Sequence, residues 1–177
     1  LVRDGSPVPS GWGNPGPALV RGDVLDPPAV RLAVQGKDAV LCALGAGRRG
    51  RLRTEGTRNL VEAMDGAGVR RLVCLSTLGV GESRENLNFV WRYLMFGFLL
   101  RTAFLDHVGE EYAVRRSGLD WVIVRPGAFT DGQRTGVYQH GFAPTRPGLR
   151  LQVSRADVAE FMLRQLADDT YLRQAPG

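Results

Sequence analysis

Hydrophobic residues form short unbroken runs, and stretches with helical spacing separate these runs. The clearest run covers residues 121–124 (WVIV) and is bounded by Gly118 and Pro126. Unbroken runs of β-branched and aromatic residues are typical of strands buried on both faces of a parallel sheet. The same pattern predicts strands at residues 18–20, 38–44 and 71–77, and the end of a strand at residues 1–4.

Apolar residues with helical spacing follow most of these runs. A first helix is expected after Asp26, which can cap it, and a second over about residues 54–64. The last helix opens with the capping box Ser154-x-x-Asp157. Strand alternating with helix predicts the α/β class, with a doubly wound parallel sheet in a single domain over residues 1–177.

Residues 89–100 (FVWRYLMFGFLL) interrupt this alternation and hold five of the fourteen aromatic residues. The segment is too short, and too interrupted by Arg92 and Gly97, to span a bilayer. Three interpretations stay open: a core helix between two strands, a hydrophobic lid over a flat aromatic ligand, and a membrane-surface or partner contact.

Charge and cysteine content exclude several classes of protein. The net charge of +5 comes from scattered arginines without interleaved aromatics, which argues against nucleic-acid binding. Cys42 and Cys74 both fall inside apolar strands, where free thiols behave as small hydrophobes. We therefore expect no disulfide framework and no metal site, and a reducing, cytoplasmic location.

A literal Gly45-x-Gly47-x-x-Gly50 pattern follows one strand and precedes a helix, as in dinucleotide-binding fingerprints. The fingerprint also requires an acidic residue at the end of the next strand, and Ser76-Thr77 stand there instead. The pattern by itself is therefore weak evidence for the main pyrophosphate loop.

Several short motifs, in this order and spacing, resemble the atypical short-chain dehydrogenases with an NmrA-like NAD(P)-binding domain, and most of all the flavin reductase/biliverdin reductase B group. The likeness covers almost the whole chain. It is carried by Leu-Val-Arg-Asp at the start, Gly22-Asp23-Val24-Leu25, Leu44-Gly45, Glu55-Gly56-x-Arg58-Asn59, Asp106-His107, Ser117-Gly118-Leu119, Asp131-Gly132, Thr135-Gly136-x-Tyr138 and Phe161-Met162-Leu163-Arg164.

The resemblance implies a Rossmann-like sheet, NADPH as the cofactor, and roles for particular residues. Arg3 would hold the adenosine 2′-phosphate, for which a guanidinium is well suited. Ser76, Thr77 and His107 would serve the reaction. Asp23 and Val24 would contact the adenine, and Leu44 and Gly45 would make a secondary cofactor contact from the loop after their strand. Leu75, Ser76 and Thr77 would flank the nicotinamide, and Pro126, Gly127 and Ala128 would close over its carboxamide side.

Two departures from the family bear on function. The family's first strand and its Gly-rich turn do not occur, so the sequence is expected to be a fragment or to hold a dinucleotide weakly. The usual Tyr-x-x-x-Lys acid pair is also missing, because Lys37 is the only lysine and Tyr112-x-x-x-Arg116 is the nearest approach. Arginine is a poor substitute, because it does not shed its proton.

We therefore expect a monomer or weak dimer that transfers hydride from NADPH to a flat acceptor such as a flavin, quinone or tetrapyrrole. In the alternatives, the protein is a non-catalytic NAD(P)-binding sensor of NmrA type, or an inactive fragment.

Overall fold

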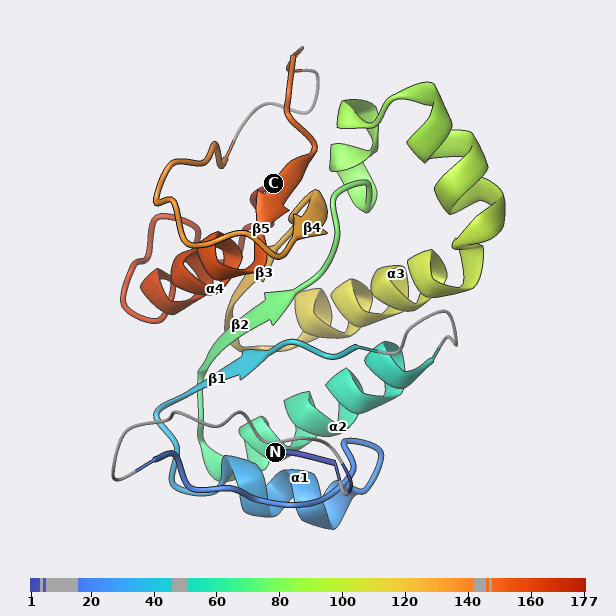
Figure 1. Cartoon of the computed structure of the whole chain (residues 1–177). Helices are drawn as coiled ribbons and strands as arrows, with labels where there is room; N and C mark the ends of the chain where they lie inside the picture. The colour runs from blue at the N-terminus through green and yellow to red at the C-terminus, as the bar shows by residue number, and fades with distance from the viewer. Residues whose placement is uncertain (4, 6–15, 46–50, 142–145, 147) are drawn as a thin grey trace.

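The computed structural model of the 177-residue chain describes residues 1–3, 5, 16–45, 51–141, 146 and 148–177. Its central sheet has three parallel strands in the order β1-β2-β3: β1 (Ala39–Cys42), β2 (Arg71–Leu75) and β3 (Asp120–Val124). Two long helices, α2 (Leu52–Ala67) and α3 (Arg101–Arg116), lie side by side on one face, and α1 (Pro27–Val34) packs on α2 (Figure 1). The opposite face carries α4 (Arg155–Arg164). This is the α/β, Rossmann-like architecture that the sequence predicts.

A second ladder extends the fold beyond β3. The short strands β4 (Ala128–Thr130) and β5 (Gln152–Ser154) pair in parallel, and β5 leads directly into α4. The capping box forms as predicted, because Ser154 Oγ accepts a hydrogen bond from the backbone N–H of Asp157.

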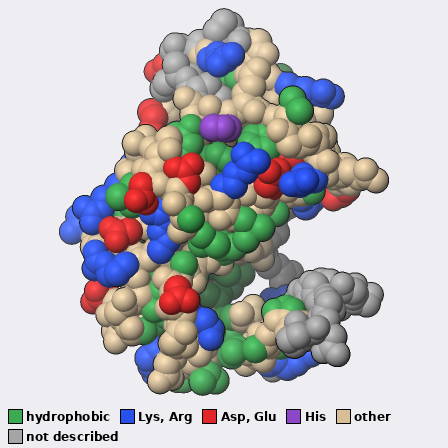
Figure 2. All heavy atoms as spheres, turned by 90° about the vertical axis from the view of Figure 1, so that its left-hand side faces the viewer, with side chains coloured by type: hydrophobic (Ala, Val, Ile, Leu, Met, Phe, Trp, Pro, Cys, Tyr) green, Lys and Arg blue, Asp and Glu red, His purple; other side chains and the backbone are tan. Residues whose placement is uncertain are grey.

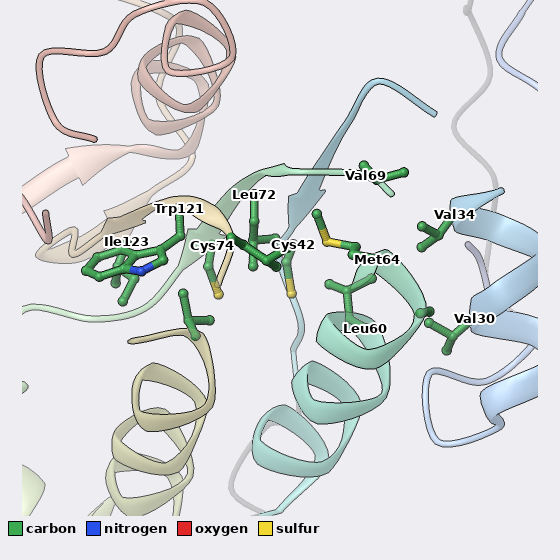
Figure 3. Close-up of a cluster of buried hydrophobic side chains, with 13 residues drawn as sticks. Val30, Val34, Cys42, Leu60, Met64, Val69, Leu72, Cys74, Trp121 and Ile123 are labelled. Carbon is green, nitrogen blue, oxygen red and sulfur yellow. The ribbon is translucent and has the colours of Figure 1, made fainter. Parts of the chain in front are cut away.

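Alternate residues of the strands point into two apolar layers. Leu72, Cys74 and Ile123 pack towards the helices of one face, and Val73 and Val122 pack towards α4. Figure 3 shows Cys42 and Cys74 on neighbouring strands, with both sulfur atoms directed towards the helical layer. Such side-chain alternation, with both faces covered, is why these strands read as continuous hydrophobic runs.

Some predicted boundaries were wrong. Residues 18–20 form no strand. Directly after them, Arg21 forms one isolated parallel bridge with Val2 at the start of the chain. Asp26 precedes α1 but makes no side-chain capping bond. The second helix runs longer than predicted and ends at Gly68, which has φ +71° and so adopts the left-handed conformation that glycine tolerates.

The interpretation of residues 89–100 as a core helix was wrong. A 3₁₀ helix, η1 (Gly81–Asn86), leads into a π-helix, η2 (Val90–Leu99), in which no residue is buried. Phe89 and Phe98 are 75% and 77% exposed. This segment rises beyond the carboxyl end of β2 and returns to the start of α3 (Figure 1). Among the described residues, no helix is long and apolar enough to cross a membrane.

Charged side chains of both signs cover much of the surface that includes α1 and α4. Figure 2 shows hydrophobic side chains gathered in a hollow at the mid-height of this face. Leu41 of β1 is 41% exposed, because β1 is an edge strand of the described sheet.

Candidate functional site

A cavity of about 370 Å³ lies where the carboxyl ends of the parallel strands meet the aromatic segment. Ligands of open α/β sheets bind at this edge, and the volume lies within the usual range for small-molecule sites. Nine of the residues predicted for the site line this one cavity: Leu44, Gly45, Leu75, Ser76, Thr77, His107, Pro126, Gly127 and Ala128.

Aromatic side chains form the outer wall of the cavity. Trp91 and Phe96 of η2 and Phe104 of α3 line it. The rings of Phe96 and Phe104 stack with centroids 4.9 Å apart, and Trp91 meets Phe96 at 5.6 Å. The inner side of the exposed segment therefore offers flat apolar surfaces to a ligand.

His107 of α3 lines the cavity, and its ring contacts Glu110, one turn later on the same helix. Its Nδ1 lies 3.0 Å from Oε2 of Glu110, a residue with no exposed surface. The other Glu110 oxygen, Oε1, accepts longer hydrogen bonds of 3.5 Å from Thr57 Oγ1 and from Cys74 Sγ. A carboxylate in this position fixes the ring of the histidine and its tautomer.

Ser76 belongs to a buried ionic network at the floor of the cavity. Arg125, which is 1% exposed, donates two hydrogen bonds to Glu111, of 2.9 and 2.7 Å, and one of 2.8 Å to Glu82 of η1. Burial alone lowers the pKa of Arg125, but the bonds and charges of Glu111 and Glu82 outweigh burial and raise it. Both Glu111 oxygens accept hydrogen bonds from Arg125, and Oε1 also accepts one of 2.7 Å from the Ser76 hydroxyl. The only hydrogen that the Ser76 hydroxyl can donate is therefore used in this bond.

Asp106, next to His107, caps α2 from outside that helix. Its two carboxylate oxygens accept the backbone N–H groups of Arg53 and Thr54, each at 3.0 Å, and Oδ1 also accepts the Thr54 hydroxyl at 2.9 Å. Burial alone raises the pKa of Asp106, but these backbone and side-chain hydrogen bonds hold it below its ordinary value. The two adjacent residues thus have different roles. Asp106 caps α2, and His107 lines the cavity.

Three predicted cofactor residues do not line this cavity. Arg3 is exposed at the start of the chain, and Asp23 Oδ1 accepts the backbone N–H of Leu25 at 2.9 Å. Val24 packs over Gly56 beside Leu44, so that a Cβ at Gly56 would lie 2.7 Å from Val24 and 3.1 Å from Leu44. Val24 therefore lies close to Leu44, which lines the cavity, but does not line the cavity itself.

Other candidates from the sequence occupy different places. Gly47 and Gly50 of the glycine pattern lie outside the described residues, as does Asp4. Tyr112, of the Tyr112-x-x-x-Arg116 pattern, is 56% exposed, and its ring lies 5.4 Å from the Arg116 guanidinium. His140 is exposed and borders a second cavity, of about 620 Å³, between α4 and the β4–β5 ladder.

The structure also brings together a buried group that the sequence did not suggest. One ligand atom each of Cys42, Cys74 and Glu110 lies within 4.8 Å of the others. Each of these atoms already has a hydrogen-bonding neighbour, and the hydrogen bond with Cys42, together with burial, raises the pKa of Cys74 well above its ordinary value. A buried thiol whose pKa is raised, such as that of Cys74, is structural rather than reactive.

Sequence reasoning missed four residues around the cavity: Arg53, Glu110, Glu111 and Arg125. The signals were the acidic pair three and four positions after His107 on a predicted helix, and an arginine directly after a fully buried strand. Residues three or four apart share a helix face, so these carboxylates were placed to face the same sheet edge as the histidine.

Solved structures with the same fold include reductases. A short-chain dehydrogenase/reductase from Veillonella parvula, in complex with NADP, matches with a TM-score of 0.69 and 22% identity over 89% of this chain and 70% of its own. The anaerobilin reductase ChuY from Escherichia coli matches with a TM-score of 0.68 and 23% identity over 89% of this chain and 72% of its own. At these identities the likeness concerns the fold.

Sequence comparisons identify the family. The UPF0659 protein YMR090W of Saccharomyces cerevisiae is 31% identical over 140 residues, 76% of this chain and 58% of its own. An uncharacterized chloroplastic protein of Arabidopsis thaliana, At2g34460, is 31% identical over 132 residues, 70% of this chain and 46% of its own. The chain thus spans about half the length of these curated relatives. The NAD(P)H-binding family model matches residues 1–169, and the chain belongs to this family, in agreement with its resemblance to the atypical short-chain dehydrogenases.

Proposed function

We propose that the protein is an NADPH-dependent reductase that delivers a hydride to a flat, conjugated acceptor such as a flavin, a quinone or a linear tetrapyrrole. The observation that carries this proposal is the convergence of nine residues, chosen from the sequence for cofactor or catalytic roles, on one cavity at the carboxyl edge of the sheet. Membership of the NAD(P)H-binding family supports the cofactor.

The residues present fit a phosphorylated nicotinamide ligand. Arg53 lines the cavity, and two nitrogens of its buried guanidinium, Nε and Nη1, have no hydrogen-bond partner in the described part of the chain. Leu44, Leu75 and Pro126 supply apolar contacts for a planar ring. In this proposal Arg3 holds the adenosine 2′-phosphate, and Asp23 and Val24 contact the adenine. When bound, NADPH supplies the hydride.

The protein's own groups would orient the reactants and manage one proton. Because the Ser76 proton is committed to Glu111, Ser76 offers the cavity a hydrogen-bond acceptor, suited to an N–H of the nicotinamide carboxamide or of the acceptor. His107, backed by Glu110, is placed to pass a proton through Nε2. Trp91 and Phe96 would cover the acceptor and exclude water.

Reduction of simple ketones is not expected. Hydride transfer to a ketone leaves a strongly basic alkoxide that must be protonated as it forms, and no tyrosine–lysine pair is available for this in a chain whose only lysine is Lys37. Ser76 cannot donate to that oxygen either, because its hydroxyl proton is already used.

A non-catalytic NAD(P)-binding sensor is the second candidate. The observation that favours it is the outer face of the aromatic segment, where Phe89, Tyr93, Leu94 and Phe98 are all more than half exposed. Contiguous apolar surface of this kind marks contact sites for partners.

Steady-state oxidation of NADPH, compared across a flavin, a quinone and a small ketone, decides between these functions. The reductase proposal predicts turnover with the flavin or the quinone and little with the ketone. Tight NADPH binding without oxidation by any acceptor would establish the sensor instead.

A further inference from the structure

Arg53 is a buried cation whose hydrogen-bonding capacity is not used. It sits in the first turn of α2, is 9% exposed, and lines the cavity. Its Nε and Nη1 are both shielded from solvent, and within the described residues neither has a hydrogen-bond partner. A buried polar group without a partner costs about 1–3 kcal/mol, and more when it is charged, so such a group requires an explanation.

Asp106 does not provide that explanation. Its nearest oxygen, Oδ2, lies 3.7 Å from Arg53 Nη1, which is an ion pair but not a hydrogen bond. Both Asp106 oxygens already accept the backbone N–H groups that open α2. The carboxylate thus stabilises the guanidinium charge but leaves Nε and Nη1 without a hydrogen-bond acceptor among the described residues.

A planar guanidinium with free N–H donors is the protein group best matched to a phosphate. We propose that Arg53 is an anion-binding residue of this cavity and takes one phosphate of the bound ligand. This inference rests on the proposed function, and it is separate from Arg3, which is assigned to the adenosine end of NADPH. The phosphate has two candidate sources: the one next to the nicotinamide ribose, or the terminal phosphate of an acceptor of the FMN type.

Two pairs of small molecules separate these sources, because the members of each pair differ only by one phosphate. Nicotinamide mononucleotide and nicotinamide riboside report on the cofactor phosphate, and FMN and riboflavin report on the acceptor phosphate. Dissociation constants are measured by calorimetry for the unmutated protein, for Arg53→Met, and for Arg58→Met as a control. Arg58 lies on the same helix and is exposed.

The unmutated protein and Arg58→Met are expected to bind the phosphorylated member of one pair about ten- to hundredfold more tightly, the value of a charge-assisted pair. Arg53→Met should remove this advantage while leaving the affinity for the unphosphorylated member unchanged. The pair that shows the effect identifies the source. An advantage that survives in Arg53→Met overturns the proposal, and so does the absence of an advantage in both pairs when pyrophosphate binding is also independent of Arg53.

Thermal unfolding without ligand gives a readout that is independent of binding. Removal of unsatisfied donors should leave the melting temperature of Arg53→Met equal to or above that of the unmutated protein. A lower melting temperature together with an unchanged phosphate advantage would assign Arg53 to structure alone. If Arg53→Met fails to fold, Arg53→Lys takes its place, since it keeps the charge and loses the planar set of donors.

Inorganic pyrophosphate distinguishes failure of this inference from failure of the proposed function. Binding of pyrophosphate that depends on Arg53, in a protein that binds neither nicotinamide mononucleotide nor FMN, supports the anion site and rejects the reductase. Binding of NADPH and of FMN that is in both cases indifferent to Arg53 rejects the anion site and leaves the reductase standing.

Discussion

His107 and Glu110 face each other across one turn of α3, with Nδ1 of the imidazole 3.0 Å from Oε2 of the carboxyl group. Glu111, the next residue, is paired with the permanent cation of Arg125, whereas the partners of Glu110 among the described residues are His107, Thr57 and Cys74. The His107–Glu110 pair therefore joins an imidazole at the wall of the cavity to a buried carboxyl group that has no arginine partner among the described residues.

Glu110→Gln tests whether this pair supplies a proton. Reduction of a quinone needs a proton as well as a hydride, whereas the flavin product is stable as an anion near neutral pH. With a quinone as acceptor, we expect Glu110→Gln and His107→Ala each to lower kcat by about 10²–10⁴-fold, with a much smaller loss for FMN. Equal losses with both acceptors, at unchanged NADPH affinity, would show that Glu110 serves the fold only.

Other charged or titratable groups near the His107–Glu110 pair are Arg53, Asp106, Cys42, Cys74 and Glu111.

Arg125→Met should destabilise the fold by about 3–5 kcal/mol, because it leaves Glu111 buried without its cation. Arg115→Met is the matched control. Arg115 lies 3.6 Å from the same Glu111 and 3.8 Å from Glu82, but its side chain is 39% exposed, and its loss should cost less than about 1 kcal/mol. Urea unfolding measures both. Similar losses for the two variants would contradict the assignment of Arg125 as the anchor.

Much of the fold and part of the site could be predicted from periodicity and strand ends. The buried strands gave clear patterns because both of their faces are covered, as at Leu72 and Val73. The loops after these strands were expected at one edge of the sheet for the same reason, since parallel strands end together, whereas Leu44, Gly45 and Ala128 were named from the family resemblance.

The remaining features depend on contacts between distant parts of the chain. Asp106 caps a helix that begins more than fifty residues earlier, so its task is invisible in local sequence. Residues 89–100 have the composition of a core helix, and nothing in the local sequence shows that Trp91 and Phe96 line the cavity while Phe89 and Phe98 are exposed. A buried arginine with unused donors, such as Arg53, cannot be recognised before its surroundings are known.

Acid stability should depend on Asp157. Burial alone raises its pKa, but the bonds from the backbone of Gly136, the hydroxyls of Ser154 and Thr135, and the backbone of Thr135 lower it to about 2. A carboxylate with a lowered pKa stabilises the fold above its unfolded-state pKa, and this contribution is lost as the pH falls. The melting-temperature difference between the unmutated protein and Asp157→Asn should therefore shrink between about pH 4 and pH 2. The exposed Asp131→Asn serves as the control, and a difference independent of pH would contradict this account.

Arg3→Ala tests the cofactor preference. If Arg3 holds the 2′-phosphate, the unmutated protein binds NADPH about ten- to hundredfold more tightly than NADH, and Arg3→Ala abolishes this preference. Arg21→Ala, at the bridge partner of Val2, should keep it. Equal affinity of the unmutated protein for both cofactors would contradict the assignment.

Gly45→Leu tests most directly whether the cavity is the reaction site. A Cβ at Gly45 meets nothing within 4 Å, so the larger side chain is tolerated on the cavity wall while it fills space assigned to the cofactor. Gly66→Leu is the control, because Gly66 also has open space but lies in α2 outside the cavity lining. The measurement is the rate of hydride transfer from NADPH to FMN, together with the melting temperature of each variant. The account predicts a rate at least tenfold lower for Gly45→Leu at an unchanged melting temperature, and an unaltered rate for Gly66→Leu, since a loss of about 1.4 kcal/mol of binding is a factor of ten. Full activity in a folded Gly45→Leu protein would show that the reaction takes place elsewhere.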